Sequence, residues 1–156
     1  MTGLTTAATA NSAQAAAPSN TYRITNVASH STLRAYQAGE EVFVSSTRES
    51  PGPFELWHFE RSESGYTIQN VGLSMTQTSD SYAAARQATE GEAVITSRDA
   101  TVWSIEPAGN GTFVIKVPGE DLLWNAEPPV IPRGNVKLRD ANGSDTQRWT
   151  FVPATQ

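Results

Sequence analysis

The chain has 156 residues, of which 11 are lysine or arginine and 16 are aspartate or glutamate, so its formal net charge is −5. This length favours one domain with a single core, and the acidic balance excludes the basic surface of a nucleic-acid-binding protein. Cysteine is absent from the sequence, which excludes disulfides and thiolate metal ligands and fits a reducing compartment.

Residues 1–20 are rich in alanine, threonine and serine. They lack the basic start and the apolar run of a secretory signal peptide, and no stretch of the chain has the continuous apolar length that spans a membrane. We therefore expect a cytoplasmic protein without membrane insertion. The first 20 residues are expected to form a flexible arm, or a short element that docks on a neighbour.

A repeat of about 46 residues runs through the rest of the chain. Its clearest markers are Trp57, Trp103 and Trp149, which lie 46 and 46 residues apart and each begin the alternation of a half-buried strand. An aromatic residue 35 to 37 positions before each tryptophan, then a leucine, then a glycine followed by a valine complete the repeat. These markers are Tyr22, Leu33, Gly39 and Val42; Tyr66, Leu73, Gly91 and Val94; Phe113, Leu122, Gly134 and Val136. We predict four short strands in each unit.

Turn-forming pairs separate the units. Ser64-Gly65 and Asn110-Gly111 stand between alternating runs and supply residues that tolerate positive φ in a tight hairpin. The units are therefore predicted at about residues 21–63, 64–110 and 111–154. Three propeller blades would be fewer than the usual four to eight, so we expect a closed, pseudo-threefold all-β structure of twelve strands. Its predicted core collects Ile24, Leu33, Val42, Trp57, Ile68, Leu73, Val94, Trp103, Ile115, Leu122, Val136 and Trp149.

The end of the third unit carries a resemblance to a known family. Gln147-Arg148-Trp149 matches the Gln-x-Trp signature of the ricin B-type lectins, whose fold is the β-trefoil. The openings TYRITNVAS and GYTIQNVG and the ending TQRWTF resemble small fungal β-trefoil proteins, a group that contains lectins and protease inhibitors. The resemblance covers about residues 20–154. It implies a β-trefoil that binds glycans or glycoproteins without catalysis, with a protease inhibitor acting through an exposed loop as the alternative.

The sugar pocket of the ricin B-type lectins uses an aspartate just after the leucine of the second strand, a stacking aromatic just after the third strand, and a polar residue shortly before the Gln-x-Trp. The aspartate accepts sugar hydroxyls and the aromatic ring packs on the apolar face of the sugar. Here the first two units offer Arg34 and Ser74 after the leucine, and in the third unit Asp121 precedes the leucine while Arg139 stands at the aromatic position. The pocket is therefore expected to be eroded in all three units.

Trp124 is the one tryptophan outside the 46-residue spacing, and it is a candidate for a different sugar site. It stands beside Asn125 in a proline-stiffened stretch, and Asp140 and Asn142 follow in the next loop. An aromatic ring beside amide and carboxylate groups in a rigid loop could bind a sugar at little cost in ordering. The alternative is that Trp124 is buried at the end of the barrel, as large aromatic residues usually are.

Weaker sugar-binding candidates occur in the first two units: His30 and Tyr36 in the first, and Asp80 and Tyr82 in the second. The alternative, which the residues themselves favour, is that each of them is an ordinary exposed loop residue.

The inhibitor alternative needs a rigid loop that presents a residue to a protease pocket. The resemblance marks the loop of residues 36–41, which contains neither lysine nor arginine. Arg48, beside two prolines, and Arg86, in a longer loop, are the residues that other loops offer. The alternative, which the residues themselves favour, is that both are solvated arginines of connecting loops.

The sequence implies no cofactor and no metal ion, because His30 and His58 alone cannot hold one and no catalytic motif is present. We therefore expect a protein that is not an enzyme. Its expected partners are glycans or glycoproteins, or a protease in the alternative reading, and not nucleic acid. A homodimer would raise the avidity of weak sugar binding.

Overall fold

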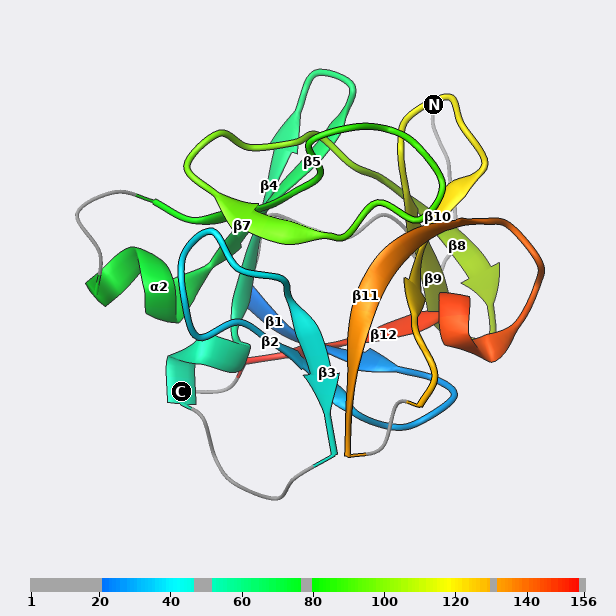
Figure 1. The fold of residues 1–156 in the computed structure, drawn as a ribbon, viewed down its shortest axis with the longest axis horizontal. Coiled ribbons are helices and arrows are strands. Elements are labelled where there is room, and N and C mark those ends of the chain that lie inside the picture. Colours follow the sequence, from blue (N-terminus) through cyan, green and yellow to red (C-terminus); the bar gives the residue numbers. More distant parts are fainter. Residues whose placement is uncertain (1–20, 47–51, 77–79, 130–131, 155–156) are drawn as a thin grey trace.

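The computed structural model describes residues 21–46, 52–76, 80–129 and 132–154 (Figure 1). The predicted arm of residues 1–20 and Arg48 lie outside these ranges. Within them the chain forms twelve strands and three short helical segments. The strands are β1 (Thr21–Asn26), β2 (Thr32–Arg34), β3 (Phe43–Ser45), β4 (Trp57–Ser62), β5 (Gly65–Asn70), β6 (Tyr82–Ala84), β7 (Ile95–Ser97), β8 (Ser104–Gly109), β9 (Thr112–Lys116), β10 (Leu122–Ala126), β11 (Arg133–Asp140) and β12 (Trp149–Pro153). The helical segments are η2 (Gly52–Glu55), α2 (Val71–Thr76) and η3 (Asp145–Gln147).

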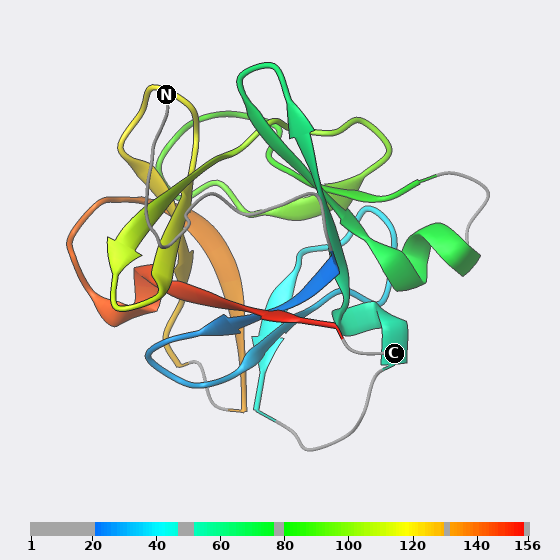
Figure 2. The ribbon, with the colours of Figure 1, turned by 180° about the vertical axis from the view of Figure 1, so that it is seen from behind.

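Six of the strands close into a barrel. The antiparallel pairs β1–β4, β4–β5, β8–β9, β9–β12 and β12–β1 are joined by a bridge between Tyr66 of β5 and Trp103 beside β8. Figure 2 shows the closing pair, with the red β12 alongside the blue β1. Closure leaves none of these strands as an unpaired sheet edge.

The other six strands form the hairpins β2–β3, β6–β7 and β10–β11, one in each unit. Equivalent valines join the hairpins: the Val42 amide donates to the Val94 carbonyl, and the Val94 amide donates to the Val136 carbonyl, each at 2.9 Å. Strand β11 also pairs with β3, which completes a ring of three hairpins. A barrel with three hairpins in threefold repetition is a β-trefoil, as the sequence predicted.

The predicted core is confirmed. All twelve residues assigned to it from the sequence are buried, eleven of them with no exposed surface and Leu122 with 8%. Strands β1 and β5 show the expected alternation, with every second side chain buried. The repeat is therefore set by one shared core, to which each unit contributes the same kinds of residue.

A hydrogen bond that recurs in each unit fixes which residues are equivalent. The indole nitrogens of Trp57, Trp103 and Trp149 donate to the carbonyls of Leu33, Ala83 and Trp124, at 3.1, 3.0 and 3.2 Å. Each accepting residue lies at the centre of the second strand of its unit. Trp124 therefore belongs to the threefold pattern, at the place that leucine and alanine occupy in the other units.

One predicted strand is wrong. Leu73 is a core residue, yet it lies in helix α2, and the second strand of its unit is β6. The cause is Asn70, whose side-chain oxygen accepts the Leu73 amide at 2.9 Å and so starts a helical turn. The backbone amide of Asn70 donates to the Ser81 carbonyl at 2.8 Å. This bond brings the chain back beside β5 after the helical segment.

The two predicted turns differ in their chemistry. Asn110 and Gly111 have φ values of 56° and 76°, as a tight hairpin requires. Gly65 does not have a positive φ, and this position requires glycine for a different reason. A Cβ atom at this position would overlap the carbonyl oxygen of Trp103, to which the Tyr66 amide donates at 2.8 Å.

Candidate functional site

Trp124 cannot be a sugar platform, because it lies in the core with no exposed surface. Its ring packs edge-to-face against Trp103, with centroids 5.2 Å apart, and against Trp149 at 6.3 Å. The whole of β10 is buried. The prediction went wrong because it matched Leu122 with Leu33, whereas the indole hydrogen bonds place Trp124 at that position.

The corrected equivalence also moves the positions at which the resemblance locates the sugar pocket. These positions are the residue after the second-strand core residue, the residue after its partner on the third strand, and the residue three before the repeat tryptophan. They are Arg34, Ser45 and Phe54 in the first unit, Ala84, Ser97 and Ala100 in the second, and Asn125, Arg139 and Thr146 in the third. We call the region around them the outer site of the unit.

Aromatic rings fill the outer site of the first unit. The ring of Tyr36 lies 5.6 Å from that of Phe43 and 5.7 Å from that of Phe54. The Ala35 amide donates to the Phe54 carbonyl, which holds η2 against the end of β2. The central volume of this site is therefore taken by the protein's own side chains.

A polar network fills the outer site of the third unit. Asn125 donates to Glu127 at 2.7 Å and accepts from Thr146 at 2.8 Å. Arg139 donates to both carboxylate oxygens of Glu127, at 3.1 and 2.8 Å, in the two-pronged geometry that suits a guanidinium and a carboxylate. The hydrogen bonds from Arg139 hold the pKa of Glu127 below its usual value, against the opposing effect of burial.

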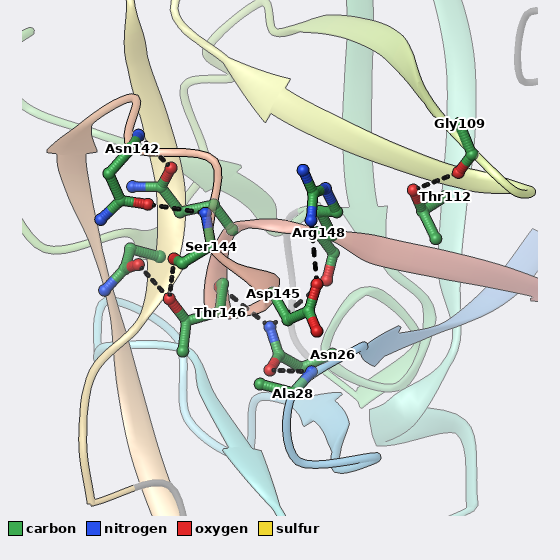
Figure 3. A network of polar contacts seen from close by, with 11 residues as sticks. Asn26, Ala28, Gly109, Thr112, Asn142, Ser144, Asp145, Thr146 and Arg148 are labelled. Atoms are coloured by element: carbon green, nitrogen blue, oxygen red, sulfur yellow. Dashed lines mark hydrogen bonds and ion pairs between the residues drawn. The ribbon is translucent and has the colours of Figure 1, made fainter.

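The structure joins the predicted Asn125, Asp140 and Asn142 in one network of the protein's own hydrogen bonds, in which Asp140 takes part through its backbone carbonyl and Asp140 and Asn142 are exposed. Gln147 donates to the Asp140 carbonyl and accepts the Asn142 amide, each at 2.9 Å. The chain of bonds then runs from Asn142 through neighbouring side chains to Asn125, as Figure 3 shows for Asn142, Ser144 and Thr146. The side-chain oxygen of Asn142 is used by the Ser144 amide, and Asn125 is 7% exposed. Gln147, 1% exposed, fixes the loop between β11 and β12.

The outer site of the second unit is hollow. Its cavity has a volume of about 650 Å³, within the range typical of small-molecule sites. Alanines stand where the other units carry large or polar side chains, so the site lacks the groups that would fill it. The lining combines Ile95 and nine small residues with four charged ones: Ala38, Gly39, Ser81, Ala84, Ala85, Thr96, Ser97, Ala100 and Thr101, with Asp80, Arg86, Arg98 and Asp99.

Charged groups of both signs are available to a ligand in this hollow. Arg86 and Arg98 are exposed, and within the described part of the chain neither guanidinium has an ion-pair partner. Asp80 accepts from the hydroxyl of Tyr82 at 3.4 Å, and burial followed by the charge of Asp80 raises the pKa of that phenol. The Asp99 amide is fixed by Ser97 at 3.1 Å.

The remaining sequence candidates fall in separate places. His30 is exposed in the turn between β1 and β2, with a φ of 58°. Tyr36 lies at the first outer site, and Asp80 lies beside the second with the half-buried Tyr82 next to it. Arg86, predicted as an inhibitor residue, lines the hollow.

Sequence reasoning missed Arg98, Asp99 and the alanines of the second unit. Residues 97–100 read Ser-Arg-Asp-Ala, directly before the Thr-Val-Trp that precedes the last strand of the unit. The signal was an alanine three residues before Trp103, at a position where the other units hold phenylalanine or threonine. A cavity forms where side chains are small, and small residues do not attract notice when a sequence is read for reactive or hydrogen-bonding groups.

The arrangement defines a β-trefoil protein with one open outer site, and solved structures share its fold. The ricin B-like lectin of Macrolepiota procera, solved with lactose, is 19% identical with a TM-score of 0.76 over 90% of this chain and 100% of the lectin. The Rhizoctonia solani agglutinin is 22% identical with a TM-score of 0.74, over 91% and 100%. A designed threefold-symmetric protein is 17% identical with a TM-score of 0.71, over 86% and 99%. No protein-family model and no curated protein matches the sequence.

The described residues contain no cluster of three or more histidine, aspartate or glutamate side chains that could hold a metal ion. In the same part of the chain, every helix is too short or too polar to cross a membrane.

Proposed function

We propose that the protein is a non-catalytic, carbohydrate-binding lectin whose glycan site is the hollow of the second unit. The observation that supports this most is the cavity itself. It lies at the positions where the resemblance to ricin B-type lectins locates a sugar pocket, and it is open there while the equivalent sites of the other units are filled.

The lining offers what a polyhydroxylated ring requires. The carboxylates of Asp80 and Asp99 can accept hydrogen bonds from sugar hydroxyls, and the guanidinium groups of Arg86 and Arg98 can donate them. The alanines leave room for a ring to lie close to the backbone. A shallow polar site of this kind is expected to bind a monovalent sugar at millimolar to micromolar concentration, roughly 4 to 8 kcal/mol.

Structures of the same fold support the assignment by analogy, since the Macrolepiota procera protein is a lectin solved with lactose. Nothing in the described residues favours the protease-inhibitor alternative. Arg86 lines a cavity, and the loop of residues 36–41 has no basic residue. A cytoplasmic location and self-association as a homodimer remain part of the proposal.

The test fills the hollow with the residue that the first unit uses. Ala100→Phe places the side chain of Phe54 at the equivalent position and should lower the binding of at least one glycan on an array at least about tenfold, because the ring occupies the ligand volume of the hollow. The matched control is Ala88→Phe, which adds the same ring at an exposed alanine outside the cavity lining and should leave binding unchanged. Folded protein that binds no glycan, or an Ala100→Phe variant that binds like wild type, would refute this site.

A further inference from the structure

We propose that the first unit carries a second glycan site, built around Tyr36, that takes a neutral pyranose with a flat apolar face. The site is a groove of about 440 Å³. Its lining is Tyr36, Gln37, Glu40, Glu41, Phe43, Arg133 and Asn135. The proposal rests on the proposed function for its ligand class, but the groove is a different cavity from the hollow. It also lies outside the filled outer site of the first unit, since Arg34, Ser45 and Phe54 do not line it.

Tyr36 supplies the aromatic surface that the hollow of the second unit lacks. It is 42% exposed, and among the described residues only Met75 and Val152 are comparably exposed large apolar side chains. Of the three, Tyr36 alone lines one of the cavities described above. The rings of Phe43 and Phe54 pack against it, so stacking a sugar on it costs little side-chain entropy.

The neighbouring ring is already occupied. The guanidinium carbon of Arg133 lies 3.5 Å from the centroid of Phe43, a cation–π contact that covers that ring while the guanidinium keeps its positive charge. Tyr36 is therefore the ring left for a ligand.

The polar lining favours a neutral ligand. Glu40 and Glu41 bring two carboxylates that can accept sugar hydroxyls, and a hydrogen bond from Asn135 fixes Glu41 in place. The two carboxylates outnumber the single guanidinium of Arg133 in the lining, so the groove is acidic on balance and disfavours sialic or uronic acids. The hollow of the second unit differs, because its two arginines match its two aspartates.

A buried threonine holds the wall of the groove rigid. The hydroxyl of Thr96 accepts the Gly39 amide at 2.9 Å and donates to the Gln37 carbonyl at 3.2 Å, and its own amide donates to the Glu40 carbonyl at 3.1 Å. These bonds hold the loop between β2 and β3 against β7, where Figure 1 shows it in cyan. Residues 36, 37, 40 and 41 line the groove while Ala38 and Gly39 line the hollow. One rigid loop thus separates two sites and makes a single chain bivalent.

The experiment maps both sites at once on the full chain. The isotope-labelled protein is titrated with lactose, methyl α-mannopyranoside, chitotriose and 3′-sialyllactose, and the backbone amide signals are followed by NMR. We expect at least one neutral sugar to shift the signals of residues 36–43 saturably. Tyr36→Ala should weaken this response about tenfold while leaving responses at residues 84–101 unchanged. Tyr36→Phe, which keeps the ring, should bind within about threefold of wild type.

Two further variants guard against indirect effects. Glu40→Gln removes a charge from an exposed side chain and should weaken the response at residues 36–43 without altering the rest of the spectrum. Met75→Ala removes another exposed apolar side chain, 71% exposed, and should change nothing. Shifts confined to residues 84–101, or wild-type affinity in Tyr36→Ala, overturn the second site and leave the proposed function standing. Shifts at neither site overturn both.

Discussion

The second and third units place different groups at equivalent positions of the same fold. In the third, Asn125, Glu127, Arg139 and Thr146 bind one another. In the second, alanines leave a cavity of about 650 Å³. The barrel repeats because three units share one core, and a change there would disturb all of them. An outer site contacts mainly its own unit, so each can be filled or emptied separately.

The largest expected loss of stability comes from changing a core residue of one unit to its counterpart in another. Trp124→Ala gives the third unit the residue that the second already has at Ala83. Because Trp124 has no exposed surface, the substitution should lower the free energy of unfolding by about 3 to 5 kcal/mol. Urea titration measures this loss. A Trp124→Ala protein of normal stability that no longer binds glycans would restore Trp124 as the sugar platform.

A smaller effect is expected from the polar network of the third unit. Glu127→Gln removes the carboxylate that Arg139 clasps and should cost about 1 to 2 kcal/mol of stability at neutral pH, toward the lower end because Arg139 is 36% exposed and Glu127 19%.

At acid pH the difference in stability between wild type and Glu127→Gln should disappear. Since folding lowers the pKa of Glu127, its contribution is fully present above the ordinary pKa of 4.5 and is lost as pH falls through the lowered value. The variant should therefore lose less stability than wild type below pH 4.5. Unfolding curves at several pH values give the comparison, and parallel losses in the two proteins would contradict it.

The smallest effect on stability should come from the hollow. Arg86→Ala removes an exposed guanidinium from the position that Glu127 holds in the third unit, so the unfolding free energy should change by less than about 0.5 kcal/mol. Glycan affinity should fall about fivefold or more, since a hydrogen bond to a charged group is lost. Arg139→Ala is the matched control, with the opposite expectation of lower stability and unchanged binding. If Arg86→Ala and Arg139→Ala lowered glycan affinity equally, the conclusion that the second unit holds an open site and the third does not would be wrong.

The sequence was sufficient to predict the core and the fold. Apolar residues at fixed offsets, with Trp57, Trp103 and Trp149 as markers, fall on barrel strands whose alternation is regular. The second strands were harder to place, because Leu33, Ala83 and Trp124 differ in size and lie 24, 20 and 25 residues before their tryptophans. Matching by residue type therefore misplaced two of the three.

The open site was beyond the reach of residue-by-residue reasoning. Ala84 and Ala100 carry no chemistry that a pattern search would notice, and their importance appears only beside Arg34 and Phe54 or Asn125 and Thr146. Tyr36 was noticed as an aromatic residue. What could not be predicted was that Phe43 and Phe54 would support its ring while leaving it 42% exposed.

The full burial of the tryptophans has a practical consequence for spectroscopy. All four have no exposed surface, so their emission should be blue-shifted and insensitive to aqueous quenchers until the chain unfolds. Intrinsic fluorescence would then report the unfolding transition cleanly and remain silent when a sugar binds. The optical signal in the binding sites would have to come from tyrosine absorbance, and Tyr36 is placed to provide it.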